Sequence, residues 1–386
     1  MRIAHIQLTG PYTEKFNYQE NLLPRYQLQQ ENQVLFLGSC YTWNHGKIVR
    51  VNPTKKQLSD GLTLERLPFR SFGSEFLTRK IRWAPKLYNR LCEFQPDFIM
   101  MHDYQSLSTY SVCRYMDTHP GVRLVIDCHT DVHNSATNWL SREVLHKLIY
   151  KRIAQAAAKR AKVLYYLSLE TKEFMRSVYD LPEEKMEYLP LGGIIPEKAD
   201  YQAKRNSRRK ELGLASEDVL IVHSGKLTAG KKTVDLLTAM RRIGAQNVFL
   251  AVIGSADDPK TKEALDIASE EDSRIRYLGW KSGDDLLEYL CAADIYAQPG
   301  TQSATMQNAA CCGCAEVLYP YSSHKVLLGD AVLYAENVEQ LTQALNSLVT
   351  DPQLLKKKKE QLFQVACEKL DYKKQAERIL QAGATT

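Results

Sequence analysis

Short apolar runs rich in β-branched residues alternate with longer segments of helical periodicity from one end of the chain to the other. This alternation places a helix between consecutive strands, and strands joined in that way run parallel. In the first half of the chain the predicted strands are residues 2–8, 33–37, 97–101, 123–128, 162–167 and 186–189, and the predicted helices are residues 18–29, 76–92, 107–117, 141–161 and 168–179. The pattern predicts parallel sheets covered by helices.

The pattern stops at residues 190–196, where two glycines stand between two prolines. A chain of 386 residues also exceeds the size at which one hydrophobic core keeps growing. The sequence therefore predicts an α/β protein of two Rossmann-like, doubly wound domains, residues 1–193 and 194–371. They would face each other across a ligand-binding cleft at the carboxyl ends of their strands. The predicted strands of the second domain are residues 219–223, 248–253, 274–278, 295–298 and 316–318.

The composition excludes several classes of protein. Apolar residues make up 44% of the chain and charged residues 25%, as in a folded globular protein. A net charge of +6 is too small for a dedicated nucleic-acid binder but suits an anionic substrate or a lipid surface. No apolar run approaches the roughly 18 residues of a membrane span, and residues 1–6 lead directly into a strand rather than a signal peptide. We expect a cytoplasmic protein that touches membranes only peripherally.

Nine cysteines form an odd set scattered through apolar segments, which indicates reduced thiols in the core. Cys311, Cys312 and Cys314 are close enough in sequence to suggest a metal site. Neighbouring residues on a helix face different ways, however, and no second cysteine pair follows at ligand spacing. Packing is the favoured interpretation of these three residues.

The segment from His223 to Thr233 carries the strongest functional signal. An apolar strand, residues 219–223, leads into a turn at Gly225, and a helix begins near Thr233. Backbone N–H groups and the positive end of a helix dipole favour a phosphate at such a place. Lys226 and Lys231 flank the turn with positive charge. The alternative is a basic turn in solvent.

The same segment nearly matches a P-loop. Gly225, Gly230 and Lys231 fit the P-loop spacing, but Lys232 stands where a Ser or Thr should hold magnesium. The following strand, residues 248–253, also ends without an acidic metal ligand. A P-loop-like nucleotide hydrolase is therefore a less favoured alternative.

Residues 225–232 resemble the glycine, basic, leucine, lysine motif of the retaining glycosyltransferases of family 4, which have the GT-B fold. The resemblance implies that Gly225 belongs to the donor site and that Lys226 and Lys231 hold the diphosphate of a nucleotide sugar. Their charge would stabilise the leaving diphosphate as the glycosidic bond breaks. The segments that precede the donor site in this family are also similar, in the same order, to residues 277–280, 286–290 and 292–299.

The family normally places two glutamates eight positions apart, ahead of a helix of small residues. Here Gln302 is the nearest stand-in for the glutamate beside the transferred sugar, and Asn308 occupies the place of the glutamate that binds the ribose. Amides can still exchange hydrogen bonds with hydroxyls. The alternative is a small-residue helix that only packs against a sheet. If the donor binds here, backbone N–H groups at the helix start would assist, namely those of Ser303, Ala304 and Thr305.

Two amino-terminal features also resemble the family. His129 follows an apolar strand and resembles the histidine that contacts the donor sugar. With Asp131 and His133 it also has a spacing that could ligate zinc, although no further ligand follows at a recognisable spacing. The turn after the first strand, with Gly10 and Asn17, resembles the acceptor-side loop, in which glycines are usual.

Two segments mix basic and aromatic residues, namely residues 76–90 and 146–152. Helices of this composition can lie on anionic lipid. The alternative is a solvated helix face.

The resemblance implies transfer of a sugar, with retention of configuration, from a nucleotide-diphosphate donor to a glycan or lipid-linked acceptor, as in cell-surface polysaccharide or glycoconjugate synthesis. It also implies no essential metal or other cofactor, and a segment at residues 372–386 that crosses back to the first domain. A non-catalytic GT-B partner subunit is the rival hypothesis, because the two glutamates are missing. The presence of Lys226, Lys231 and His129 favours the enzyme.

Overall fold

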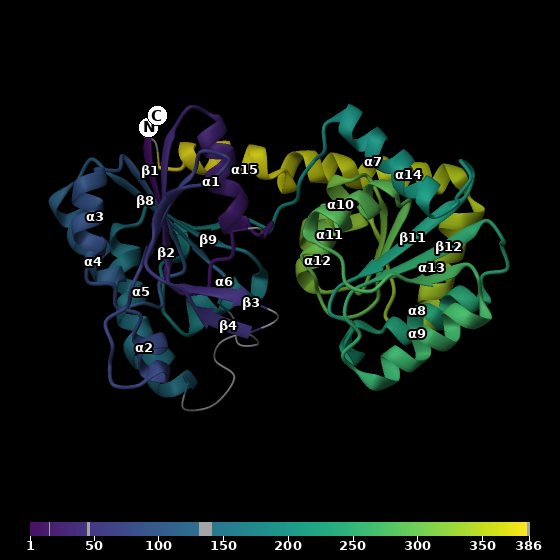
Figure 1. Cartoon of the computed structure of the whole chain (residues 1–386), viewed down its shortest axis with the longest axis horizontal. Helices are drawn as coiled ribbons and strands as arrows, with labels where there is room; N and C mark the ends of the chain where they lie inside the picture. Colours follow the sequence, from purple (N-terminus) through teal and green to yellow (C-terminus); the bar gives the residue numbers. More distant parts are fainter. Residues whose placement is uncertain (15, 45–46, 131–140, 384–386) are drawn as a thin grey trace. The chain divides into compact units, whose positions relative to one another are not determined.

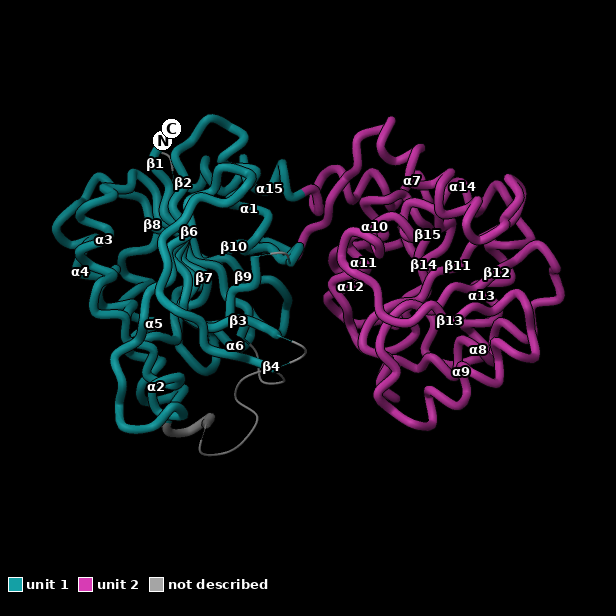
Figure 2. Tube along the Cα trace, viewed as in Figure 1, with its two compact units in different colours: residues 1–190, 372–386 teal, residues 191–371 magenta. Residues whose placement is uncertain are grey.

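The chain forms two compact units. The computed structural model describes residues 1–14, 16–44, 47–130 and 141–383 (Figure 1). Unit 1 comprises Met1–Pro190 and Tyr372–Thr386, and unit 2 comprises Leu191–Asp371 (Figure 2). The sequence pattern placed the boundary after Gly193 instead. Gly193 falls in unit 2 because its N–H donates to the carbonyl of Leu370 at 2.8 Å.

The described residues of unit 1 form an eight-stranded sheet and one hairpin. The strand order is β10-β9-β8-β7-β1-β2-β6-β5, and all neighbours are parallel except β5 and β6. The hairpin pairs β3 with β4. The strands are β1 (Arg2–Gln7), β2 (Gln33–Ser39), β3 (Tyr41–Asn44), β4 (Lys47–Arg50), β5 (Lys55–Gln57), β6 (Thr63–Leu67), β7 (Phe98–His102), β8 (Arg123–Cys128), β9 (Val163–Tyr166) and β10 (Met186–Tyr188).

Helices cover both faces of this sheet. Alternate residues of a strand point to opposite faces, and Ala4 and Ile6 of β1 belong to the core that α3, α4, α5 and α6 close. The other face of the sheet carries α1, which packs against α15 (Figure 1). The helices are α1 (Gln19–Gln29), α2 (Glu75–Ile81), α3 (Leu87–Phe94), α4 (Thr109–Thr118), η1 (Ser141–Tyr150), α5 (Lys151–Arg160), α6 (Leu169–Ser177), η2 (Glu183–Lys185) and α15 (Tyr372–Gln381).

Unit 2 has a six-stranded parallel sheet in the order β13-β12-β11-β14-β15-β16. The strands are β11 (Val219–Ser224), β12 (Val248–Ile253), β13 (Ile275–Tyr277), β14 (Ile295–Gln298), β15 (Ala315–Leu318) and β16 (Leu333–Tyr334). The helices are α7 (Lys198–Glu211), η3 (Ala229–Lys231), α8 (Thr233–Arg242), α9 (Pro259–Glu271), α10 (Gly283–Ala292), α11 (Thr305–Cys311), α12 (Ser322–Leu328), η4 (Gly329–Ala331), α13 (Val338–Thr350), α14 (Pro352–Val365) and η5 (Ala366–Leu370). Both units thus have the doubly wound α/β architecture that the alternation predicts.

Two segments of unit 1 differ from the sequence prediction. Residues 41–67 contain four strands that the pattern does not predict, because β5 is polar and exposed and β3 pairs only with β4. The predicted helix at residues 76–92 is two helices, α2 and α3. It breaks because Arg82 adopts a φ of 53° and Pro85 follows. No helix in the described ranges has the length and hydropathy of a membrane span.

Candidate functional site

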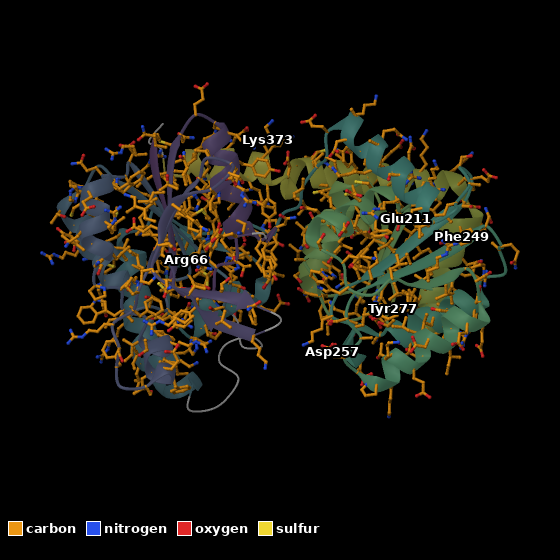
Figure 3. All side chains as sticks on the ribbon, viewed as in Figure 1. Arg66, Glu211, Phe249, Asp257, Tyr277 and Lys373 are labelled. Carbon is orange, nitrogen blue, oxygen red and sulfur yellow. The ribbon has the colours of Figure 1, made fainter. Side chains whose placement is uncertain are left out.

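Two glycine turns meet at the carboxyl edge of the unit 2 sheet. Gly225 follows β11 with a φ of 135°, and Gly254 follows β12 with a φ of 150°, a region that residues with a Cβ atom rarely adopt. A Cβ atom on Gly254 would lie 1.8 Å from the carbonyl oxygen of Gly225. The hydroxyl of Tyr277, which Figure 3 labels, donates to the carbonyl of Gly254 at 3.0 Å. Bare backbone is therefore required at this edge.

Lys231 joins two loops at the same edge. Its side chain is buried, and Nζ donates to the carbonyls of Thr301 and Gln302 at 2.8 and 2.9 Å. A Cβ atom on Gly300 would lie 2.2 Å from the carbonyl oxygen of Gly230, so the loops touch through their backbones. Burial lowers the pKa of the Lys231 ammonium to about 8. Lys231 is thus a cation held by the loops at neutral pH.

Lys226 has a different setting. Its side chain is 71% exposed, and its ammonium lies 3.6 Å from a carboxylate oxygen of Asp257, which Figure 3 labels. An ion pair this exposed is weak. Lys226 is therefore able to exchange Asp257 for another anion at little cost.

The structure brings the two predicted donor segments together. A Cβ atom on Gly225 would lie 3.8 Å from both Nζ of Lys231 and Oγ of Ser303. Helix α11 begins just beyond, and the N–H of Thr305 donates to Oγ of Ser303 at 3.4 Å, with Ala304 between them. Gly225, Lys231 and the start of α11 thus share one site.

The two amides that stand in for the glutamates have protein partners. Nε2 of Gln302 donates to Oγ of Ser323 at 2.9 Å. Oδ1 of Asn308 accepts from the N–H of Ile194 at 3.1 Å. Asn308 therefore helps to hold the start of unit 2, and its contact with a ribose stays a prediction.

A polar interior lies next to this loop. The hydroxyl of Tyr296 lies 3.3 Å from Oγ of Ser224 and donates to Oε1 of Gln298 at 3.3 Å. Nε2 of Gln298 donates to the carbonyl of Thr301 at 2.6 Å. Glu316 lies opposite Tyr296 in the register of the neighbouring strand β15. Burial raises the pKa of the Glu316 carboxyl well above its usual range. Burial therefore favours the protonated form of the Glu316 carboxyl.

In unit 1, His129 stands directly after β8. Its N–H donates to Oδ1 of Asp103 at 3.0 Å, and Nε2 lies 3.5 Å from Oδ1 of Asp127. The His129 side chain is 30% exposed, whereas Asp127 is fully buried. Burial lowers the pKa of His129, but Asp127 raises it more, to about 10. His129 is therefore an imidazolium at neutral pH.

The zinc alternative of the sequence involves His129, Asp131 and His133. Asp131 and His133 lie outside the described residues. Within them, the ligand atoms of His102, Asp127 and His129 all lie within 4.8 Å of one another. Nδ1 of His102 is already hydrogen bonded to Asp127 at 2.8 Å, so this cluster is a hydrogen-bonded network. The three clustered cysteines of unit 2 are buried thiols.

A buried arginine holds the predicted acceptor-side loop. Arg66 of β6, labelled in Figure 3, donates to the carbonyls of Tyr12 and Ser39 at 3.0 Å. Oγ of Ser39 in turn donates to the carbonyl of Gly10 at 3.0 Å. A small cavity adjoins the loop. The polar and charged side chains that line it, together with Gly10, come from Thr9, Ser39, Tyr41, Arg79 and Arg82. Asn17 lies between this loop and α1.

Sequence reasoning missed several residues that shape these sites. Gly254 and Gly300 pack against the predicted turn, and each follows an apolar strand, which was a usable signal. His102 and Asp127 also escaped notice, although polar residues inside apolar strands are uncommon. His102 and Asp127 lie together because β7 and β8 are neighbours in the sheet, and the order of strands in the sheet does not follow from their order in the chain.

Two family models match the chain. The model of glycosyl transferases group 1 matches residues 204–365, and that of glycosyltransferase family 4 matches residues 32–192. No curated protein sequence matches the chain.

Solved structures share the fold over nearly the whole chain. Alr3699/HepE from Anabaena, in complex with UDP, is 14% identical, with 99% of each chain covered and a TM-score of 0.69. Sucrose-phosphate synthase from Thermosynechococcus elongatus is 15% identical, with 98% of this chain and 97% of that chain covered and a TM-score of 0.68. A glycosyltransferase from Rickettsia africae is 12% identical, with the same coverage and a TM-score of 0.70. With a family 4 domain followed by a group 1 domain on this fold, the chain belongs to the GT-B glycosyltransferases.

Proposed function

We propose that this enzyme transfers a sugar from a nucleotide-diphosphate donor to a glycan or lipid-linked acceptor, with retention of configuration. The convergence of Gly225, Lys231 and Ser303 on one point carries the proposal, because bare backbone and a buried cation suit a diphosphate. The structural neighbour from Anabaena was solved with UDP and with UDP-glucose, which supports a donor of this class.

The two lysines bind the diphosphate in different ways. Lys231 is fixed by two carbonyls and gives the site a positive charge at neutral pH. Lys226 leaves Asp257 and binds the outer phosphate oxygens as the donor enters. Both charges stabilise the diphosphate as it leaves the sugar. His129 donates to a sugar oxygen, and the reaction needs neither a metal nor another cofactor.

Melting temperatures with UDP, GDP and ADP test the donor site. A ligand that binds only the folded state raises the melting temperature, and a concentration 100 times its dissociation constant adds about 2.7 kcal/mol. We expect one of the three nucleotides to stabilise the protein with and without EDTA. No stabilisation by any of them would refute the donor site and favour the non-catalytic subunit. Once a donor is known, the anomeric configuration of the product, read by NMR, tests retention.

The cavity beside the acceptor-side loop suits an acceptor that carries negative charge. Arg79 and Arg82 contribute side chains to its lining beside Gly10. The phosphate of a lipid-linked acceptor is one such group. An enzyme with this acceptor would act in the synthesis of a cell-surface polysaccharide or glycoconjugate. We expect Arg79→Ala to raise the KM for a phosphate-bearing acceptor and to leave the KM for the donor unchanged.

A surface of unit 1 fits an anionic membrane at the cytoplasmic side. Phe76 and Leu77 on α2 are 68% and 46% exposed, and Leu148 and Ile149 on η1 are 57% and 48% exposed. The two helices adjoin, because the hydroxyl of Tyr150 donates to the carbonyl of Lys80 at 2.6 Å. Basic residues accompany the apolar ones on these two helices and at the start of α5, namely Arg79, Lys80, Lys147, Lys151 and Arg152. Such a surface suits peripheral binding.

Sedimentation with vesicles tests this surface. We expect binding to vesicles of phosphatidylglycerol and phosphatidylcholine, and little binding to phosphatidylcholine alone. Phe76→Ser should weaken binding, whereas Val326→Ser, at a residue of unit 2 that is 59% exposed, should not. Equal binding by both variants and the unaltered protein would contradict the assignment.

A further inference from the structure

A chain of buried polar side chains crosses the sheet of unit 1 beneath α1. His5, His102 and Asp127 lie on β1, β7 and β8, three neighbouring strands, and all three are 0% exposed. Nδ1 of His5 lies 3.1 Å from Nε2 of His102, and Nδ1 of His102 lies 2.8 Å from Oδ2 of Asp127. Residues so placed are normally apolar, and buried polar groups are costly unless they are fully paired. The network therefore calls for a reason beyond packing.

The direction of the hydrogen bonds follows from the far end of the network. The amide of Gln27, on α1, lies 2.7 Å from Nε2 of His5, and its nitrogen has no partner when its oxygen faces the ring. Turning the amide over lets the nitrogen donate to His5. His5 then donates to His102, and His102 donates to Asp127. Burial together with His102 lowers the pKa of His5 to about 3, so the His5 imidazole is neutral at neutral pH.

All donors in the network thus point at Asp127. Oδ2 of Asp127 accepts from His102 and also from Nε2 of Gln19 at 3.1 Å. The other oxygen, Oδ1, faces Nε2 of His129 at 3.5 Å. The Oδ2 atom of Asp127 is therefore held by two buried donors, while its Oδ1 atom faces His129, whose side chain is partly exposed.

We propose that Asp127 is a positioning residue that keeps His129 as an imidazolium, and that Gln27, His5 and His102 are the relay that holds Asp127 charged and oriented. With Nε2–H directed at Asp127, the imidazolium ring is fixed in one orientation and also carries a proton on Nδ1. His129 then acts only as a donor, and its hydrogen bond to a ligand oxygen is charge-assisted.

The other charged groups around His129 act in the same direction. Asp103, at the end of β7, accepts the N–H of His129, and Asp103 and Glu20 of α1 both raise the pKa of His129. Burial raises the pKa of Asp127, but His102 and His129 outweigh it and hold that pKa below its usual range. The carboxylates of Asp103 and Glu20 therefore add to the effect of Asp127 on the charge of His129.

NMR of the protein with labelled histidine tests the effect of Asp127 on His129 without any substrate. The His129 signal is identified by its loss in His129→Gln. We expect it to stay protonated through neutral pH, with a midpoint near the pKa of about 10. In Asp127→Asn the midpoint should fall to about 6.5 or below, the ordinary value for histidine. Asp117→Asn removes a carboxylate that pairs with Arg160 elsewhere in unit 1, and should leave the midpoint unchanged.

A midpoint near 6.5 in the unaltered protein would overturn the proposal. An unchanged midpoint in Asp127→Asn would overturn it as well. Because neither result depends on a donor or acceptor, both are distinct from a failure of the proposed function.

The activity of Asp127→Asn adds a test that rests on the proposed function. A histidine with a midpoint of 6.5 is protonated about thirtyfold more at pH 5.5 than at pH 8. The kcat of Asp127→Asn, relative to the unaltered enzyme, should therefore rise about thirtyfold between pH 8 and pH 5.5. A constant ratio would assign Asp127 a structural role only.

Discussion

Lys226 and Lys231 belong to one short motif, yet their surroundings give them different physical properties. The ammonium of Lys231 is buried and bonded to two carbonyls, whereas that of Lys226 is mostly exposed beside Asp257. A buried group contributes to stability as well as to binding, and an exposed one contributes chiefly to binding. Replacing each lysine in turn therefore separates the two contributions.

We expect Lys231→Ala to lower the free energy of unfolding by about 1–3 kcal/mol and to abolish stabilisation by the bound nucleotide, because two carbonyls lose their donor. Lys226→Ala should change stability by less than about 0.5 kcal/mol and weaken nucleotide binding about tenfold. Denaturant unfolding and calorimetric titration measure the two effects. Lys232→Ala, whose ammonium contacts the carbonyl of Glu336, is the matched control and should change neither.

The buried acid Glu316 predicts a stability that depends on pH. The unfolded chain releases this proton near pH 4.5, whereas the folded protein retains it to higher pH. The stability of the unaltered protein therefore falls as pH rises from 4.5 through the folded pKa, relative to a variant that cannot ionise. As pH rises above 4.5, the free energy of unfolding, measured by denaturant at several pH values, should therefore fall more in the unaltered protein than in Glu316→Gln. Parallel curves for both proteins would contradict this.

The sequence predicts which residues form the donor turn but not what their side chains contact. The glycine and lysine spacing placed Gly225 and Lys231 at a phosphate site, and the structure adds that Lys231 bonds to the loop after β14. The partner of Asn308 could not be predicted, because Ile194 is 114 residues away in the chain. Contacts between distant segments depend on the fold.

Helix α7 is tied to the unit 2 sheet by one carboxylate. Asp294, just before β14, accepts from Arg205 and Arg209 of α7 at 2.7 and 3.1 Å, and from Lys359 of α14 at 3.2 Å. It also accepts the N–H of Leu220 at 3.0 Å. These partners hold the pKa of Asp294 below its usual range despite its burial. One residue thus joins two helices to two strands.

Removing this carboxylate should loosen α7. We expect Asp294→Ala to lower the free energy of unfolding by about 3–5 kcal/mol, since it leaves three largely buried cations without their carboxylate counterion. Glu271→Ala breaks an exposed pair with Arg241 and should cost less than about 1 kcal/mol. Denaturant unfolding compares the two. A similar loss in both variants would mean that the Asp294 cluster is not a fixed point of the helix.

The elements that the sequence predicts are those with a buried face. Strands such as β11 and β12 are apolar along their length, and Ser282 caps α10, because its Oγ accepts the N–H of Asp285. The unpredicted elements are short or exposed, as β5 is. A strand with no buried face has no alternation of apolar and polar residues by which its sequence could be recognised.

Unit 1 is completed by the far end of the chain. In α15 the side chains of Ala376 and Ile379 are fully buried against unit 1, and Nε2 of Gln375 donates to the carbonyl of Pro190 at 3.0 Å. Arg123 of β8 donates to the carbonyl of Leu380 at 2.8 Å. The final helix is therefore an integral part of a unit whose other residues end at 190.

We expect Ile379→Ala to destabilise unit 1 by about 2–5 kcal/mol, because it leaves a cavity beneath α15. Lys374→Ala, an exposed residue of the same helix, should change stability by less than about 0.5 kcal/mol. Hydrogen exchange followed by mass spectrometry resolves the two units. Exchange should accelerate in peptides of residues 1–190 and not in those of unit 2, and acceleration in both would show that the units unfold together.

This arrangement affects how the protein forms on the ribosome. Unit 2 is continuous in sequence and can fold as soon as residue 371 has emerged. Unit 1 begins first but lacks α15 until residue 381 has emerged, so the face of its sheet beside α1 stays partly uncovered until then. Premature termination near residue 371 would release an intact second unit attached to an unfinished first one, and chaperones would meet the apolar surface that α15 normally covers.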